Sequence, residues 1–167
     1  MRIALVAHDS RKKELVEWVK YNEKALINDQ NKIYATGTTA KLIKEALVCN
    51  YLDSIGDYPD FYPSRVDALY NSKIIALHSG PLGGDAEIGA MIAKEEIDVL
   101  IFFCDNLVVQ GHQNDIYGLT RLASLYNIAF ATNRTTADMI LTSPLFKDPS
   151  YKRILPPAIE NYKNRTV

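Results

Sequence analysis

Five short runs of apolar residues are spaced along the chain, and stretches with helical periodicity separate them. The runs are rich in β-branched residues and comprise IALVA (3–7), KIYA (32–35), KIIALH (73–78), IDVLIFF (97–103) and IAFA (128–131). Most of them are continuously apolar rather than alternating, which is typical of parallel strands that helices cover on both faces. The pattern therefore predicts a five-stranded, mainly parallel sheet.

Between the runs, apolar residues recur at spacings of three and four, as on a helix with one buried face. Four such patterns lie at about 15–26, 42–47, 88–92 and 119–126. Alternating strands and helices imply right-handed crossovers, so we expect one doubly wound α/β domain over residues 1–167, a three-layer Rossmann- or flavodoxin-like sandwich. Ser10 is the expected N-cap of the first helix. A short final helix is expected after Pro157, where it can dock on a neighbouring subunit.

One connection does not fit this alternation. Residues 49–72 hold five aromatic residues and several aspartates and prolines, and a connection of this length is unusual in a compact α/β domain. It can serve as an active-site lid or an oligomer contact, or it can be a surface excursion that is partly helical near 64–70. We favour the surface excursion.

Composition narrows the class of protein. Hydrophobic residues make up 47% of the chain, charged residues 23%, and the formal net charge of -1 comes with scattered basic residues. A nucleic-acid-binding surface needs clustered Lys and Arg, so no nucleic-acid partner is expected. No apolar run approaches the roughly 18 residues that span a bilayer, and Cys49 and Cys104 show no disulfide framework. We expect a cytoplasmic protein that does not bind a membrane.

Polar residues gather where the predicted strands end. In an open parallel sheet, ligands bind beyond the carboxyl ends of the strands, so these residues are expected to share one edge. In strand order they are His8 and Asp9 with Lys12, then Thr36–Thr39, then Ser79–Asp85, then Cys104–Asn106 with His112 and Asp115, and finally Thr132 and Asn133.

The TGTT turn at 36–39 suits a phosphate group. Gly37 allows close backbone approach, the hydroxyl and N–H groups at a helix start donate to anionic oxygens, and Lys12 adds a positive charge. The same threonines would also serve as plain helix caps. The chain has neither GxGxxG after its first strand nor GxxxxGK[ST], so the sequence does not support a dinucleotide or NTP-hydrolysing site.

GPLGGD at 80–85 places a carboxylate beside a glycine-rich turn. Backbone N–H groups in such a turn can face a ligand, which makes Asp85 a candidate general base. Taken alone, Asp85 would be interpreted as the N-cap of a helix that starts near Ala86.

His8 and His112 are candidates to polarise a carbonyl or to transfer a proton. Asp115 follows His112 by three residues and can orient its ring, whereas His78, at the end of a buried strand, is interpreted as structural. The histidines and carboxylates lack the tight spacing of metal ligands, so no metal is expected.

Taken together, five motifs resemble the methylglyoxal synthase family. They are VAHD (6–9), YATGTT (34–39), SGPLGGD (79–85), IDVLIFF followed by Asp105, and ATN with TAD (131–138). The resemblance covers nearly the whole chain except about 49–72, which we interpret as an insertion. It implies a lyase that converts dihydroxyacetone phosphate to methylglyoxal and inorganic phosphate through an enediolate, without a cofactor. It also implies a homohexamer with inorganic phosphate as an allosteric inhibitor.

The resemblance assigns roles residue by residue. Asp85 matches the catalytic base. The other matched positions are the substrate-contacting His8 and His112, the active-site carboxylates Asp9, Asp105 and Asp115, the phosphate-binding Lys12, Thr36, Gly37, Thr38, Thr39, Ser79 and Gly80, and Arg165 near the C-terminus. Asn106 replaces a proline that is usual in the family, and Gly111 and Gln113-Asn114 lie in a loop that is usually richer in proline.

Two other functions are compatible with the same order of strands and helices. A non-catalytic regulatory domain that binds a phosphate metabolite would keep the TGTT turn but would not need Asp85, His8 and His112 together. A receiver domain would need an acidic pair after the first strand and a lysine after the fifth, where this chain has His8-Asp9 and Thr132-Asn133.

Overall fold

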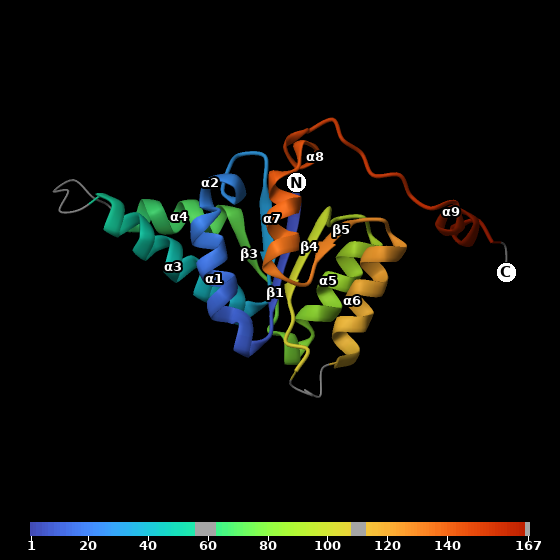
Figure 1. Ribbon diagram of the computed structural model, residues 1–167, viewed down its shortest axis with the longest axis horizontal. Helices are drawn as coiled ribbons and strands as arrows, with labels where there is room; N and C mark the ends of the chain where they lie inside the picture. Colours follow the sequence, from blue (N-terminus) through green and yellow to red (C-terminus); the bar gives the residue numbers. More distant parts are fainter. Residues whose placement is uncertain (56–62, 108–112, 166–167) are drawn as a thin grey trace.

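The computed structural model describes residues 1–55, 63–107 and 113–165. A five-stranded, all-parallel sheet lies between two layers of helices (Figure 1). The strands are β1 (Arg2–Ala7), β2 (Lys32–Ala35), β3 (Ile74–Ala76), β4 (Val99–Phe103) and β5 (Ala129–Ala131). The helices are α1 (Lys12–Tyr21), α2 (Glu23–Leu26), α3 (Gly37–Ile55), α4 (Pro63–Lys73), α5 (Gly84–Ala93), α6 (Gln113–Leu125), α7 (Arg134–Thr142), α8 (Pro144–Lys147) and α9 (Pro157–Lys163), with short 3-10 helices η1 (Asp9–Arg11) and η2 (Gly80–Leu82). All five expected strands are confirmed.

The sheet has the strand order β3-β2-β1-β4-β5. The central strand β1 pairs in parallel with β2 and β4, so that Ile3 lies opposite Ile33 on one side and Val99 on the other. The order therefore reverses between β1 and β4, and the loops that leave these two strands turn to opposite faces of the sheet. Such a reversal opens a crevice at the carboxyl edge, where open α/β sheets bind ligands.

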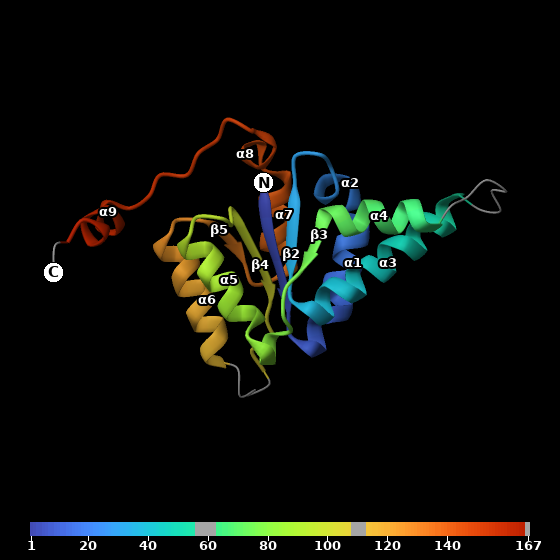
Figure 2. The ribbon, with the colours of Figure 1, turned by 180° about the vertical axis from the view of Figure 1, so that it is seen from behind.

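Each face of the sheet has its own buried core, because successive strand residues point to opposite faces. Ile3 and Leu5 pack with Trp18 and with residues of α3, α4 and α7 on one face. Val6 and Phe102 pack with residues of α5 and α6 on the other. Figure 2 shows the two helical layers on either side of the strands. The expected three-layer, doubly wound fold is confirmed.

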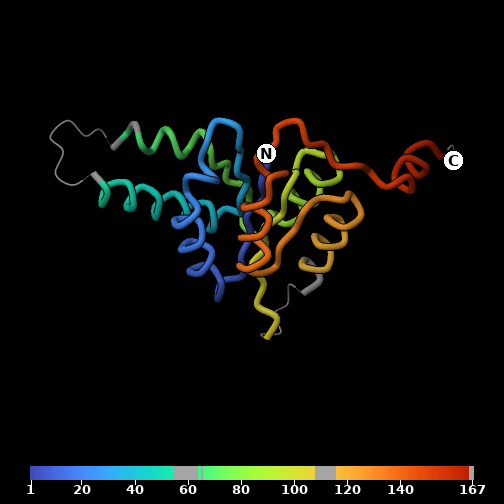
Figure 3. The backbone as a smooth tube through the Cα atoms, turned by 45° about the horizontal axis from the view of Figure 1, so that its top comes forward, coloured from blue at the N-terminus to red at the C-terminus, as the bar shows by residue number. Residues whose placement is uncertain are grey.

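The described parts of the segment at 49–72 are helical: the expected helix near 64–70 is confirmed within α4, and residues 49–55 belong to α3, which the sequence did not predict. Helix α3 continues to Ile55, α4 begins at Pro63, and the two helices run side by side away from the sheet (Figure 3). Glu23 ties both helices to α2, because its carboxylate accepts from the buried Tyr70 hydroxyl at 2.6 Å and from the Asn50 amide at 3.0 Å. Burial first, and then this hydrogen bond to Glu23, raises the pKa of Tyr70.

The C-terminal segment crosses the amino edge of the sheet. Arg153 donates to the Ile97 carbonyl at 2.9 Å and to Asp98 Oδ1 at 3.2 Å, and Lys163 on α9 forms an ion pair with Glu95 at 2.8 Å. The expected final helix is confirmed, and it extends to the side opposite the α3–α4 pair (Figure 3). Among the described residues, no helix combines the length and the apolar character that crossing a membrane would require.

Asp98 joins the first strand to this C-terminal segment. Burial alone would raise its pKa, but hydrogen bonds from Arg2 and the positive charges of Arg2 and Arg153 lower it below the ordinary value. The carboxylate therefore stabilises the fold above pH ~4, and this contribution is lost as the pH falls through the depressed pKa.

Replacing Asp98 by asparagine is expected to lower the free energy of unfolding at pH 7 by about 1–2 kcal/mol, because Arg2 and Arg153 lose their charged acceptor. Chemical denaturation should show this loss shrinking as the pH falls from ~4 through the depressed pKa of the folded Asp98, below which the wild-type carboxyl is itself protonated. Asp29→Asn, which removes a 2.9 Å ion pair between Lys73 and a fully exposed carboxylate, is the control and should have a smaller effect. Equal losses in the two variants would contradict the prediction.

Candidate active site

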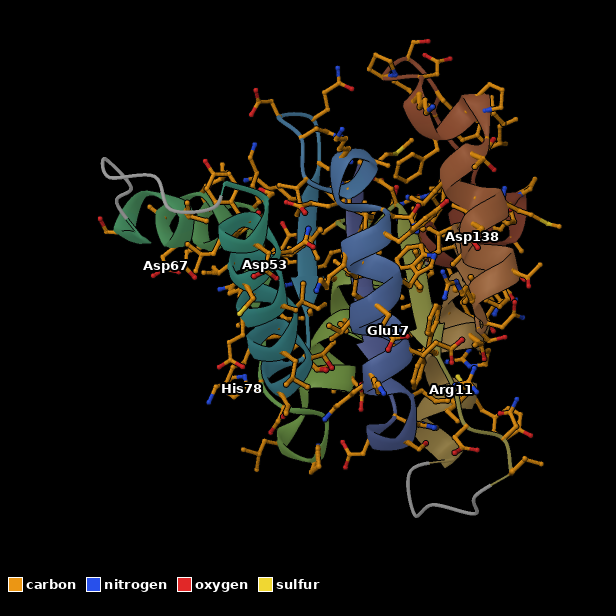
Figure 4. All side chains as sticks on the ribbon, turned by 60° about the vertical axis from the view of Figure 1, so that its left-hand side comes forward. Arg11, Glu17, Asp53, Asp67, His78 and Asp138 are labelled. Carbon is orange, nitrogen blue, oxygen red and sulfur yellow. The ribbon has the colours of Figure 1, made fainter. Side chains whose placement is uncertain are left out.

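The segments that follow the strands are joined to one another at the carboxyl edge of the sheet. The Gly37 N–H donates to the His78 carbonyl at 3.1 Å, which joins the ends of β2 and β3. The His8 N–H donates to the Phe103 carbonyl at 3.2 Å, and the Cys104 N–H donates to the Thr132 carbonyl at 3.3 Å, which joins β1, β4 and β5. Figure 4 shows this edge, with Arg11 and His78 labelled.

His8 is held in one tautomer at the carboxyl edge, where β1 ends beside β4. Its Nδ1 accepts a hydrogen bond of 2.9 Å from the Asp105 backbone N–H, and its ring packs edge-on against Phe102 with centroids 5.2 Å apart. A backbone N–H can only donate, so Nδ1 carries no proton and the neutral ring carries its proton on Nε2. The Nε2–H group can therefore donate to a carbonyl or enediolate oxygen.

The Asp105 carboxylate joins the loops that leave β1 and β4. Its Oδ2 accepts from the Ser10 hydroxyl at 2.6 Å, and its Oδ1 accepts from the Leu107 N–H at 3.0 Å. The prediction that Ser10 caps the first helix is wrong, because Arg11 holds the N-cap position of α1 without a side-chain cap. Ser10 instead fixes Asp105 beside His8.

Lys12 brings a positive charge to the segment that follows β1. It lies in the first turn of α1 with only 18% of its side chain exposed, and its ammonium forms an ion pair with Asp9, whose side chain is 90% exposed. Asp9 and Lys12 thus lie in the segment that directly follows His8. A half-buried ammonium of this kind can pair with an anionic substrate as well as with Asp9.

The TGTT turn forms the start of α3. Thr36 and Thr39 are buried, and the Thr36 hydroxyl donates to the Thr39 hydroxyl at 3.1 Å. Gly37 is required by packing, since a Cβ there would lie 3.0 Å from the Leu77 carbonyl oxygen. Its N–H is already bonded to the His78 carbonyl, so Thr38 and Thr39 are the residues of this turn whose N–H groups are candidates to bind a phosphate.

Asp85 lies in the first turn of α5 and folds back over the glycine-rich loop. Gly83 holds the N-cap position of that helix with a φ of 100°, so Asp85 is not the N-cap. A Cβ built on Gly80 would lie 3.0 Å from Asp85 Oδ2, which places the carboxylate against Gly80. Ser79 is in turn packed against the start of α3, because its backbone nitrogen lies 3.3 Å from a Cβ built on Gly37. The structure therefore brings Asp85 next to the TGTT turn.

Of the remaining predicted site residues, one lies away from this edge and two have side chains outside the described part of the chain. His112 lies outside the described residues, and Asp115 lies in the first turn of α6 but its side chain is also outside the description. Arg165 is exposed and lies just beyond α9, with its guanidinium 4.3 Å from the centre of the Tyr162 ring. Helix α9 is itself held at the amino edge of the sheet by the ion pair between Lys163 and Glu95. Within one chain, the structure does not bring Arg165 to the site.

A cavity of about 640 Å³ adjoins Asp105 between the ends of β4 and β5 and helix α6. Its lining includes Cys104, Asn106, Arg121 and Thr132. The sequence did not indicate Arg121, because that residue belongs to no motif. Burial, partly offset by the charge of Arg11, raises the pKa of the Cys104 thiol to about 11. Among the described residues, no three His, Cys, Asp or Glu side chains converge as metal ligands would.

Comparisons with known proteins point to one family. The family model for MGS-like domains matches residues 14–132. The methylglyoxal synthase of Coxiella burnetii is 39% identical over 166 residues, which cover 99% of this chain and 97% of that protein. The enzyme of that name from Leptospira interrogans is 42% identical over 92% of this chain and 86% of its own length. The crystal structure of methylglyoxal synthase from Elizabethkingia anophelis matches with a TM-score of 0.74 and 35% identity, covering 99% of this chain and 91% of that one.

Proposed function

Because this chain belongs to the methylglyoxal synthase family, we propose that it is a carbon–oxygen lyase that converts dihydroxyacetone phosphate to methylglyoxal and inorganic phosphate. One observation carries the proposal: the Asp85 carboxylate lies against Gly80, and the adjoining Ser79 lies against the TGTT turn. These contacts support the assignment of Asp85 as a base that lies close to groups able to hold a phosphate. A regulatory phosphate-binding domain would have no use for a carboxylate at that position.

The first step is the removal of a proton from carbon. Asp85 takes a proton from the hydroxymethyl carbon of dihydroxyacetone phosphate, and the C–H electron pair moves toward the ketone and forms an enediolate. The Nε2–H of His8 donates to the oxygen that gains charge, and we assign His112 to the same role. A positioned base contributes about 10²- to 10⁴-fold and one oxyanion donor about 10²- to 10³-fold, so the site needs both.

The second step is the loss of phosphate. The former ketone oxygen takes up a proton, and the proton of the remaining hydroxyl group passes to a base or to water. That hydroxyl oxygen then becomes the aldehyde oxygen, the carbon–carbon double bond shifts, and the C–O bond to phosphate breaks. The released enol of methylglyoxal then takes up a proton on carbon and becomes the ketone. Lys12, the Thr38 and Thr39 N–H groups, Ser79 and Gly80 hold the phosphate, and Asp9 and Asp105 position Lys12 and His8. No electron acceptor takes part in this route.

The direct test is incubation of the purified protein with dihydroxyacetone phosphate. We expect equal amounts of inorganic phosphate and methylglyoxal, measured by separate assays of the two products. Binding of the substrate without release of either product would instead support the regulatory domain and contradict the proposal.

We also propose that the active protein is a homo-oligomer, a homohexamer by family, in the cytoplasm, with inorganic phosphate as an allosteric inhibitor. The position of Arg165 supports the oligomer, because α9 extends beyond the domain and carries this arginine away from its own site. Arg165 then contributes to the site of a neighbouring copy. A monomeric mass in native mass spectrometry of the active protein would contradict this part of the proposal.

A further inference from the structure

Glu87 and His78 are joined by two hydrogen bonds beside the proposed site. Glu87 Oε2 accepts from the His78 backbone N–H at 2.8 Å, and Glu87 Oε1 lies 2.8 Å from His78 Nδ1. The backbone hydrogen bond first, and then the ring, keeps the pKa of the Glu87 carboxyl below its ordinary value. The Glu87 carboxylate is therefore charged at neutral pH and contacts both the main chain and the side chain of His78 through hydrogen bonds.

This pair closes the loop that holds the catalytic groups. The loop leaves β3 at His78, passes Ser79 and Gly80, and enters α5, where Asp85 and Glu87 lie in the first turn. The Gly84 N–H donates to the Ser79 carbonyl at 3.0 Å inside the loop.

His78 also connects the loop to the TGTT turn. Its N–H donates to Glu87 while its carbonyl accepts from the Gly37 N–H at 3.1 Å, so a single peptide segment links α5 to the start of α3. Movement of His78 would change the distance between the base on α5 and the phosphate donors on α3. In Figure 4, His78 lies at the carboxyl edge with its side chain projecting outward.

We propose that Glu87 and His78 are positioning residues that hold the Asp85 carboxylate in place over Ser79 and Gly80. This inference rests on the proposed function. Proton transfer from carbon is sensitive to displacements of about 1 Å in the position of the base, so a contact that fixes the first turn of α5 acts on the rate of that step. The contact adds little to folding stability, since 68% of the His78 side chain and 38% of the Glu87 side chain are exposed.

Replacing Glu87 by alanine removes both hydrogen bonds and keeps a residue that favours the helix. We expect kcat to fall by about tenfold or more, while KM stays within about twofold because Lys12, Thr38 and Thr39 are unchanged. His78→Ala keeps the backbone hydrogen bond and should cause a smaller fall. Glu87→Gln keeps an oxygen that accepts from the backbone N–H and should restore most of the lost rate.

The matched control is Glu45→Ala on α3, which removes an exposed helical ion pair with Lys41 and should leave kcat unchanged. If the wild-type protein is active and Glu87→Ala keeps its kcat, the positioning role is wrong and the proposed function stands. If the wild-type protein releases no methylglyoxal, both proposals are wrong. If Glu87→Ala lowers kcat but also raises KM by a similar factor and lowers Tm strongly, the positioning role is wrong as well. Those three changes together would indicate general damage to the fold.

Discussion

Replacing Asp85 by asparagine is expected to lower kcat for methylglyoxal formation by about 10²- to 10⁴-fold. The amide has the size of the carboxylate and fits over Gly80, but it cannot accept a proton from carbon. KM should change little, because the phosphate donors on α1 and α3 are untouched. The initial rate of methylglyoxal release, measured over a range of substrate concentrations, gives both constants.

Exchange of carbon-bound hydrogen sharpens the assignment of Asp85. In D₂O the wild-type protein should introduce deuterium into any dihydroxyacetone phosphate that returns from the enediolate, and Asp85→Asn should not. Asp67→Asn is the control, since Asp67 is an exposed carboxylate on α4 (Figure 4). Near-wild-type turnover by Asp85→Asn would reject Asp85 as the base, whatever the other variants show.

Replacing Gly84 by alanine is expected to destabilise the protein more than any other single change considered. The new Cβ would lie 2.0 Å from the His78 carbonyl oxygen, far inside the contact distance of two such atoms. The carbonyl cannot move aside easily, because it also accepts the hydrogen bond from Gly37 that joins β3 to α3. We expect a loss of about 2–4 kcal/mol in the free energy of unfolding and a fall in Tm of roughly 5–15 °C.

The same replacement at Gly118 is the control for this prediction. A Cβ at Gly118 on α6 meets no atom within 4 Å, so alanine there should leave the protein as stable as before or more stable by about 0.5–1 kcal/mol. The Tm values of the two variants show whether the added Cβ acts through steric crowding, as at Gly84, or only through helix propensity, as at Gly118. If the Gly84→Ala variant has the same Tm as the wild type, the prediction is wrong, and β3 and α5 can move apart to accommodate the Cβ.

The strands could be predicted because each lies in a short apolar run, and the central strands β1 and β4 are buried on both faces. The predicted KIYA run agrees with β2, whereas β3 ends at Ala76 and is shorter than predicted. Beyond it, the Leu77 N–H donates to the Ala35 carbonyl, and the His78 carbonyl accepts from the Gly37 N–H at the start of α3. The end of α3 at 49–55 could not be predicted in the same way. Asn50, Tyr51 and Asp53 are weak helix formers, and their helix depends on contacts with α4 and Glu23 that the local sequence does not contain.

The residues of the site could be predicted more readily than their hydrogen bonds. The rule that ligands bind at the carboxyl edge selects His8, Asp85 and Asp105 from the order of the strands alone. Which atom donates to which depends on loops that meet only after folding. The bond from the Asp105 N–H to His8 Nδ1 is the clearest case, because it joins residues far apart in the chain and fixes a tautomer that no motif specifies.

His78 shows the same difference between placing a residue and describing its role. The sequence predicted a structural residue at the end of a buried strand, and the strand end is indeed fixed by the His78 main chain. The side chain, however, is exposed, and its partner Glu87 belongs to no motif that could have indicated it.

The central position of β1 has a consequence for biosynthesis. This strand is translated before the other four strands of the sheet, and it can pair with β2 early, since Arg2 lies opposite Lys32. Its other edge stays open until β4 has been translated, because the partner of Ile3 there is Val99. A nascent chain therefore exposes an unpaired edge of a largely apolar strand until β4 is available, which favours slow completion of the sheet and reliance on chaperones.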